Sequence, residues 1–363
     1  MSMFKLGLMV LIGLSLVKVQ AKEHLAEFSI AGSQIRTLES HVVNQEYQLL
    51  INTPASYGES DKSYPVIYFL DAQWDFPLMV STYGQSFYDG FIPEAILVGI
   101  QWGGENPNPD VLRARDFTPS HLSSVPNSGG AEKFLQFIKQ ELIPFMSSEY
   151  STSDDRILMG SSYGGLFTLY TLFTQPNLFN GYVPTASASG WDNDILYSYA
   201  KGLKHKKLTR PIKLYSAIGE FDSLISAFDD LESYFKTQHF KDVSFRFERI
   251  KGLGHASVKA AANTWGLHYV FAKENVVLSK QQLTQFVGLY RSKTTNILIE
   301  VLLQKGQLML QLESNKHSLL ASSVQKFYQL GERFEVVFDS SVEPQKLSLS
   351  RFMNVDEFFR IQK

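Results

Sequence analysis

The sequence contains no cysteine, which excludes thiolate metal sites and disulfide bonds together. It also excludes the lipid-modified cysteine that anchors a bacterial lipoprotein. The eight histidines are scattered along the chain, with no HExxH motif and no closely spaced pair. We therefore expect no metal site and no cofactor, and any hydrolytic chemistry should proceed without a metal ion.

A strong charge of either sign is lacking as well. The formal net charge is −2 at pH 7, and the isoelectric point lies near 6.5. Such a chain produces no long-range field that favours DNA, RNA or an anionic lipid surface. We therefore expect no nucleic-acid partner.

The first residues have the pattern of an export signal. Lys5 supplies a positive charge, Leu6–Val17 is an apolar run, and small residues end the segment at Ala21. We predict a signal peptide over residues 1–21 and export to the periplasm or out of the cell. An uncleaved membrane anchor is the alternative, but the apolar run is shorter than the ~20 residues that cross a bilayer. We therefore expect no membrane span once the signal is removed.

The length allows one large core and a second small domain, since the chain has 363 residues and 44% of them are hydrophobic. In residues 22–276, apolar strand-like runs alternate with segments of helical periodicity. This alternation predicts an α/β domain with a mostly parallel, doubly wound sheet and helices on both faces. Residues 277–363 instead contain short strand-like runs separated by turn residues, which predicts a small antiparallel β domain.

Individual runs indicate where strands and loops lie. Gln34–Ser40 and Glu46–Asn52 alternate polar and apolar residues, as an antiparallel sheet edge does, whereas Tyr64–Leu70 is continuously apolar and predicts a central strand. The segment Gln101–Gly130 shows no sustained periodicity, so we predict a long loop that forms a pocket wall, a lid or inert surface. In the C-terminal part we expect strands at Asn296–Leu303, Gln307–Leu312, Phe334–Phe338 and Lys346–Ser350.

A Gly-x-Ser-x-Gly motif, GSSYG, surrounds Ser162 between a short apolar run and an apolar, helix-compatible run. A strand, a tight turn and a helix in this order are typical of a nucleophile elbow, so we predict that Ser162 is a nucleophile. A Cβ atom at either glycine of the motif, Gly160 or Gly164, is expected to collide with the crossing strand and helix. The alternative is a glycine-rich connection that only packs tightly.

Two further candidates, Asp222 and His255, follow later predicted strands. In open parallel sheets, functional groups gather at the carboxyl ends of the strands, and the order Ser, Asp, His is that of an α/β-hydrolase triad. His255 is expected to take the proton of Ser162, and Asp222 to hold the imidazole tautomer. Three nearby carboxylates are rivals for the role of the acid: Glu220, Asp229 and Asp230.

Hydrolysis through a tetrahedral intermediate also needs N–H donors for the developing oxyanion. We expect one from the backbone of Tyr163 and the second from Gln73, in the loop after the Tyr64–Leu70 strand. The alternative for Gln73 is an ordinary turn that it forms with Asp71.

Three tryptophans, Trp74, Trp102 and Trp191, follow predicted strand ends or lie in loops beside them. We predict that at least one stacks on an aromatic acyl group of the substrate. The alternative is that these rings cap the core.

Five short motifs occur in order along the chain. They are YPVIYFLDA from Tyr64, RARDFTP from Arg113, GSSYGG around Ser162, GEFD ending at Asp222 and GLGH ending at His255. Together they resemble the putative-esterase family of α/β hydrolases, and within it the IroE-like siderophore esterases. The family also contains esterase D, feruloyl and acetylxylan esterases and mycolyltransferases. The resemblance covers about Ser40 to Lys273.

The resemblance implies an α/β-hydrolase fold whose triad is Ser162, Asp222 and His255. It also implies that Gln73 donates an oxyanion N–H, although this chain has Asp71-Ala72 where the family usually has Asp-Gly. We therefore predict an exported serine carboxylesterase that acts on a small-molecule ester, such as an enterochelin-type siderophore, through an acyl-enzyme. Alternatives are a feruloyl or acetyl esterase acting on polysaccharide, an acyltransferase, and a non-catalytic binding protein on the same scaffold.

Overall fold

The computed structural model describes residues 29–59, 61–238, 240–343, 345–351 and 354–362. The predicted signal peptide, residues 1–21, lies outside these described residues. Within them, no helix is both long enough and apolar enough to cross a membrane.

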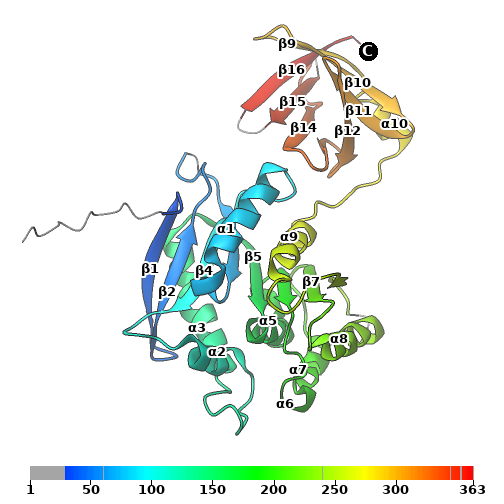
Figure 1. Ribbon diagram of the computed structural model, residues 1–363. Helices are drawn as coiled ribbons and strands as arrows, with labels where there is room; N and C mark the ends of the chain where they lie inside the picture. Colours follow the sequence, from blue (N-terminus) through cyan, green and yellow to red (C-terminus); the bar gives the residue numbers. More distant parts are fainter. Residues whose placement is uncertain (1–28, 60, 239, 344, 352–353, 363) are drawn as a thin grey trace, which may run out of the picture. The chain divides into compact units, whose positions relative to one another are not determined.

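The α/β part is built on one eight-stranded sheet (Figure 1). Its strands are β1 (Ser33–Ser40), β2 (Gln45–Asn52), β3 (Tyr64–Phe69), β4 (Ile96–Trp102), β5 (Thr152–Ser161), β6 (Gly181–Thr185), β7 (Ile212–Gly219) and β8 (Val243–Ile250). They lie in the order β1-β2-β4-β3-β5-β6-β7-β8. β2 is antiparallel to both of its neighbours, and the pairs from β4 to β8 are parallel. The predicted antiparallel edge and parallel centre are therefore confirmed.

Helices cover both faces of this sheet (Figure 1). They are α1 (Ala72–Tyr88), α2 (Pro109–Phe117), α3 (Ala131–Phe137), α4 (Ile143–Glu149), α5 (Tyr163–Thr174), α6 (Trp191–Asp194), α7 (Leu196–Leu203), α8 (Ile225–Gln238) and α9 (Lys259–Val270), with a π-helical turn at Ile138–Leu142 and a 3-10 turn at Pro176–Leu178. α1 packs beside α9, and α5 packs beside α2 and α7. Neighbouring residues of β6 show the two faces: Tyr182 joins the core under α5, whereas Val183 contacts Gly266 of α9.

The segment 101–130 is not the continuous loop that we predicted, because it contains α2. Asn108 caps this helix: its side-chain oxygen accepts hydrogen bonds from the N–H groups of Asp110 and Val111, at 3.1 and 3.3 Å. Pro109 occupies the first turn, where a missing N–H costs nothing. A helix of nine residues is too short to give a sustained apolar period, so the Asn-Pro pair was the signal that could have revealed it.

The C-terminal part is a closed antiparallel barrel, shown in orange to red in Figure 1. It follows the short helix α10 (Lys280–Thr284). Its strands are β9 (Gly288–Ser292), β10 (Leu298–Gln304), β11 (Gln307–Leu312), β12 (Asn315–Ala321), β13 (Lys326–Tyr328), β14 (Phe334–Asp339), β15 (Lys346–Arg351) and β16 (Asn354–Gln362). Each strand pairs with the next, and β16 pairs with β9 to close the barrel. The predicted antiparallel β domain is confirmed, while its boundary at residue 277 stays a prediction.

Aromatic rings fill the interior of the barrel. Phe286 and Phe338 stack with centroids 4.3 Å apart, and Phe327 meets Phe338 edge-on at 5.6 Å. Each of these side chains is at most 1% exposed. The eight-stranded barrel is therefore a packed core and not an open channel.

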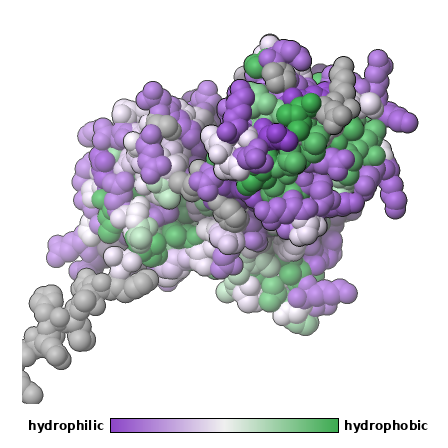
Figure 2. Space-filling view, turned by 90° about the horizontal axis from the view of Figure 1, so that it is seen from above, coloured by the Kyte–Doolittle hydropathy of each residue, from purple (hydrophilic) through white to green (hydrophobic). Residues whose placement is uncertain are grey.

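The outer surface of the barrel is only partly polar. Leu298, Leu330, Val355 and Ile361 are all exposed, and Figure 2 shows hydrophobic residues among hydrophilic ones on the face that it presents. Alternation of polar and apolar residues along the barrel strands is therefore incomplete. The sequence pattern predicted β10, β11, β14 and β15 and missed β9, β12, β13 and β16. β13 has only three residues, which is too short to show a period.

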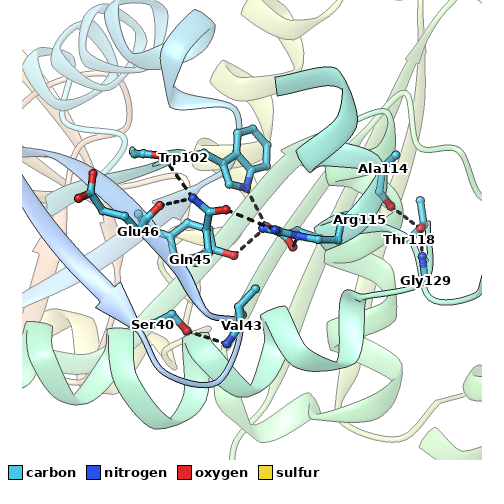
Figure 3. A network of polar contacts seen from close by, with 12 residues as sticks. Ser40, Val43, Gln45, Glu46, Trp102, Ala114, Arg115, Thr118 and Gly129 are labelled. Carbon is cyan, nitrogen blue, oxygen red and sulfur yellow. Dashed lines mark hydrogen bonds and ion pairs between the residues drawn. The ribbon is translucent and has the colours of Figure 1, made fainter. Parts of the chain in front are cut away.

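A buried carboxylate, Asp116, joins α2 to the sheet. It accepts hydrogen bonds from the Tyr47 hydroxyl and the Trp102 indole, both at 2.7 Å. Arg115 adds two more donors, with Nε 2.7 Å from Oδ1 and Nη2 3.0 Å from Oδ2. In Figure 3, Gln45 and Trp102 point toward the Arg115 end of this network. Since Asp116 is only 1% exposed, its charge depends on these donors.

Removal of the Asp116 carboxylate is expected to destabilise the fold. Burial and the charge of Asp116 raise the pKa of Tyr47, so the Tyr47 hydroxyl stays protonated and needs an acceptor. We expect Asp116→Ala to lower the free energy of unfolding by about 3–5 kcal/mol, because four donors from three residues lose their partner. Urea unfolding followed by circular dichroism measures this loss. Asp154→Ala is the control, since the Asp154 side chain pairs with Arg156 but is 94% exposed; equal losses for the two variants would contradict the prediction.

Candidate active site

Ser162 stands at the turn between β5 and α5, as the sequence predicted. Its backbone angles, φ 59° and ψ −116°, are strained for a residue with a side chain. Hydrogen bonds hold it on both sides: its N–H donates to the carbonyl of Thr185 at 3.0 Å, and its carbonyl accepts from the N–H of Leu166 at 2.9 Å. The serine side chain is only partly buried.

The two glycines of the motif have different roles. A Cβ atom at Gly160 would lie 2.4 Å from the carbonyl oxygen of Gly164, so only glycine fits there. A Cβ atom at Gly164 would meet Leu70 at 3.4 Å and the Asp71 carboxylate at 3.5 Å, which are ordinary contacts. The expected collision at Gly164 is therefore wrong, because the helix leaves room on that side.

Asp222 and His255 lie in contact after β7 and β8. His255 Nδ1 is 2.8 Å from Asp222 Oδ2, and the other carboxylate oxygen accepts from the N–H of Leu224 at 3.0 Å. Asp222 is only 4% exposed. The rival Glu220 instead accepts from the N–H of Gly252 at 2.8 Å. The acid that contacts the histidine is therefore Asp222.

The nucleophile candidate and the acid–base pair come from the same edge of the sheet. Ser162 follows β5, and Asp222 and His255 follow β7 and β8, with β6 between them. Among the described residues, no hydrogen bond joins Ser162 Oγ to His255. Such contacts often tighten only when substrate binds, so the contact between nucleophile and base stays a prediction.

Gln73 and Tyr163 both lie in the first turn of a helix. Gln73 is the second residue of α1 and Tyr163 the first residue of α5. N–H groups at these positions have no partner inside their helix, and the preceding strands β3 and β5 are neighbours in the sheet. Within the described part of the chain, the amide oxygen and nitrogen of the Gln73 side chain are buried without a hydrogen-bond partner.

Arg113 was not singled out as a site residue, although it lies in one of the five motifs. Its Nε and Nη2 donate to the two oxygens of Asp71 at 2.7 and 3.1 Å. Its guanidinium carbon lies 5.5 Å from the ring of Trp74 and 5.8 Å from the ring of Tyr163. The segment that contains α2 showed no helical period, so no sequence pattern indicated that Arg113 lies beside Asp71.

The three tryptophans differ in their surroundings. Trp74 is 50% exposed, in the first turn of α1. Trp191 is 8% exposed, packs edge-on against Tyr163 at 5.3 Å and donates from its indole to Ser120 at 3.0 Å. Trp102 is 5% exposed and bound to Asp116, which favours the packing interpretation for this ring. Trp74 is thus the most exposed of the three candidates.

A family model described as "Putative esterase" matches residues 40–265 of this chain. The chain belongs to this family. It is an ester hydrolase, and the match includes the positions of Ser162, Asp222 and His255. The putative-esterase match ends before the barrel, whose first strand begins at Gly288.

Two curated relatives have names that specify their substrates. The chain is 30% identical over 251 residues to the ferri-bacillibactin esterase BesA of Bacillus subtilis (strain 168), which covers 64% of this chain and 82% of that protein. It is 26% identical over 202 residues to the siderophore enterobactin esterase of Emericella nidulans, covering 50% of this chain and 63% of that protein.

Solved structures confirm the α/β-hydrolase fold that the resemblance implied. The BES protein from Bacillus cereus has a TM-score of 0.63 at 25% identity, covering 69% of this chain and 98% of that one. An IroE-like serine hydrolase from Shewanella oneidensis has a TM-score of 0.60 at 25% identity, covering 70% and 85%.

Alanine substitutions at the two motif glycines should have different effects on activity. We expect Gly160→Ala to slow hydrolysis and fluorophosphonate labelling of Ser162 by about 100-fold, because the turn must shift to relieve the contact with Gly164. Gly164→Ala is the matched control and should stay near wild type. Labelling rates measured by intact-protein mass spectrometry test this, and equal behaviour of the two variants would show that the close approach at Gly160 does not shape the turn.

Proposed function

We propose that this ester hydrolase is a serine esterase with Ser162 as nucleophile, His255 as base and Asp222 as the acid of a triad. The observation that carries the proposal is the contact of 2.8 Å between His255 Nδ1 and Asp222 Oδ2. It leaves Nε2 of the imidazole for the proton of a serine hydroxyl. The strained backbone of Ser162 adds support, because it is typical of a nucleophile elbow.

In the proposed reaction, His255 takes the hydroxyl proton of Ser162 while Oγ attacks the ester carbonyl carbon. The electron pair of the carbonyl moves to its oxygen and forms a tetrahedral oxyanion. Collapse of this intermediate expels the alcohol, which takes the proton from His255, and leaves an acyl-enzyme. A water molecule deprotonated by His255 then attacks the acyl carbon. The second collapse breaks the bond to Ser162 Oγ, which takes the proton back from His255, and releases the carboxylic acid. Asp222 holds the imidazole tautomer throughout and stabilises the imidazolium.

The oxyanion needs donors that are oriented before the reaction begins. We assign this role to the backbone N–H groups of Tyr163 and Gln73. Both lie in first turns, after neighbouring strands, and neither N–H is needed inside its helix. A pair of such donors typically contributes a large share of the rate enhancement in acyl transfer.

For the substrate we propose an enterochelin-type siderophore ester. The names of both curated relatives specify siderophore esters. Trp74, half exposed and next to Gln73, offers a face on which a catechol ring can stack. Export of the enzyme is part of this proposal and rests on the sequence of residues 1–21.

An ester panel on wild type and Ser162→Ala tests the proposal. It contains p-nitrophenyl acyl esters, feruloyl esters, and iron-free and iron-loaded catecholate siderophores. We expect siderophore hydrolysis and a loss of about 10⁶-fold in kcat for Ser162→Ala. A feruloyl ester as the best substrate would favour the polysaccharide esterase, transfer to an acceptor alcohol would favour the acyltransferase, and binding without turnover would favour the non-catalytic protein.

Replacing Asp222 or Glu220 by its amide tests which of the two is the acid of the triad. We expect Asp222→Asn to lower kcat by about 10⁴-fold, because the amide permits the wrong tautomer and no longer stabilises the imidazolium. Glu220→Gln should stay near wild type, since Glu220 contacts the backbone of Gly252. Steady-state kinetics on a p-nitrophenyl ester measure both. If Glu220→Gln is the inactive variant, the acid is misassigned, and if both variants are active, the triad is wrong.

Loss of the Trp74 ring should affect aromatic substrates selectively. We expect Trp74→Leu to raise KM for aryl-acyl esters by about tenfold, a loss of ~1.4 kcal/mol, and to leave short aliphatic esters nearly unchanged. Trp265→Leu on α9 is the matched control, because Trp265 is 48% exposed against 50% for Trp74. Equal rises of KM on aryl and aliphatic esters would argue against stacking at Trp74.

A further inference from the structure

Arg113 lies between the two segments that provide the proposed oxyanion donors. Its guanidinium binds both oxygens of Asp71, at 2.7 and 3.1 Å, and Nη2 also donates to the carbonyl oxygen of Ser161 at 3.4 Å. Asp71 immediately precedes α1, and Ser161 immediately precedes the nucleophile candidate Ser162. We propose that Arg113 is a positioning residue that locks the oxyanion loop, residues 71–73, onto the nucleophile elbow.

The backbone of Asp71 needs a restraint of this kind. Its angles, φ 61° and ψ 37°, are left-handed, a region that few residues other than glycine adopt. Although Asp71 is the residue before α1, its side chain does not cap the helix and binds Arg113 instead. Its carbonyl accepts from the N–H groups of Trp74 and Asp75 at 3.0 and 3.1 Å. The direction of the Gln73 N–H therefore follows from the backbone angles of Asp71.

The carboxylate of Asp71 also faces the nucleophile elbow. A Cβ atom at Gly164 would lie 3.5 Å from Asp71 Oδ2, so this oxygen lies against the first turn of α5. The Ser161 carbonyl that Nη2 reaches belongs to the last residue of β5. Arg113 thus contacts both the segment that carries the Gln73 donor and the segment that carries the Tyr163 donor.

The positive charge of Arg113 is paired with a buried carboxylate of the same chain. Asp71 is 1% exposed and the Arg113 side chain 17% exposed, so the two groups neutralise each other away from water. Burial raises the pKa of the Asp71 carboxyl, and the guanidinium of Arg113 opposes this shift. The rings of Trp74 and Tyr163 flank the guanidinium. These contacts favour an internal lock over a site that binds an anionic group of the substrate.

Loss of the positioning by Arg113 should lower kcat rather than raise KM. Negative charge develops on the carbonyl oxygen only in the transition state, so a misdirected donor lowers kcat and leaves binding of the neutral ester almost unchanged. A purely structural loss would also lower the apparent kcat at unchanged KM, because it reduces the fraction of folded enzyme. It would, however, lower the free energy of unfolding and leave the dissociation constant of the boronate for the folded enzyme unchanged. The inference rests on the proposed function, because it concerns the oxyanion donors of that same site.

Arg115 offers a matched control on the same helix. It also forms a two-contact pair with an aspartate, Asp116, that is 1% exposed, and its own side chain is 30% exposed. Its contacts lead to the network of Figure 3 around Gln45 and Trp102. Loss of Arg115 therefore removes a similar ion pair from α2 without touching the oxyanion loop.

The experiment compares Arg113→Lys, Arg113→Met and Arg115→Lys with wild type on p-nitrophenyl butyrate. It measures kcat, KM, the free energy of unfolding, and the affinity for phenylboronic acid, which forms a tetrahedral adduct with a reactive serine. Lysine keeps the charge but cannot span both Asp71 oxygens and the Ser161 carbonyl. We expect Arg113→Lys to lower kcat and boronate affinity by about 10-fold to 100-fold, with KM within about threefold. Arg115→Lys should keep wild-type kcat.

Arg113→Met should lose at least as much kcat as Arg113→Lys, and if it does not fold, the lysine variant alone decides. Equal kcat losses for Arg113→Lys and Arg115→Lys, or a loss confined to KM, would overturn the inference. If Ser162→Ala keeps its activity, the proposed function is wrong, whatever Arg113 does. If Ser162→Ala is inactive while Arg113→Lys keeps wild-type kcat, only the positioning role is wrong.

Discussion

The close crossing of β5 and α5 is the constraint on which the rest of the site depends. At Gly160 the strand approaches the carbonyl oxygen of Gly164 so nearly that a Cβ would lie 2.4 Å from it. The chain turns between these glycines only if Ser162 takes up strained angles. Burial of α5, whose residues from Gly164 to Phe173 are all buried, stabilises the helix on one side of that turn, and the sheet holds the other. The serine is therefore presented at the edge of a rigid core, which is the arrangement that precise chemistry needs.

Buried ion pairs then fix what apolar packing leaves undetermined. Hydrophobic contacts have no direction, so they cannot set the angles of a single residue such as Asp71. A two-contact pair between a guanidinium and a carboxylate is directional, and α2 supplies two of them, Arg113 with Asp71 and Arg115 with Asp116. Such pairs add little net stability, because both charges lose their hydration. Their value here is geometric: one aligns the loop after β3, and the other joins α2 to β2 and β4.

The sequence predicted the fold class and the chain order of the candidate triad because both depend on local patterns. Buried parallel strands read as apolar runs, and Ser162 and Asp222 each follow such a run at a turn. His255 follows β8, an edge strand in which polar and apolar residues alternate. The pairing of Arg113 with Asp71 could not be read in this way, since 42 positions separate them and neither lies in a periodic segment. The orientation of Trp102 could not be predicted either. A ring at the end of a strand faces either the core or a cleft, and Trp102 faces the core because its indole binds Asp116.

The barrel differs from the α/β part in how its strands pair. Its strands pair in sequence, so its fold depends on short-range turns and on a core of rings such as Phe286 and Phe338. Closure of β9 on β16 leaves no unpaired edge strand. Because aromatic side chains fill its interior, what the barrel offers to a partner is its outer surface, which includes exposed residues such as Leu330. The putative-esterase match ends at residue 265, so it covers strands of the α/β part and none of the barrel strands.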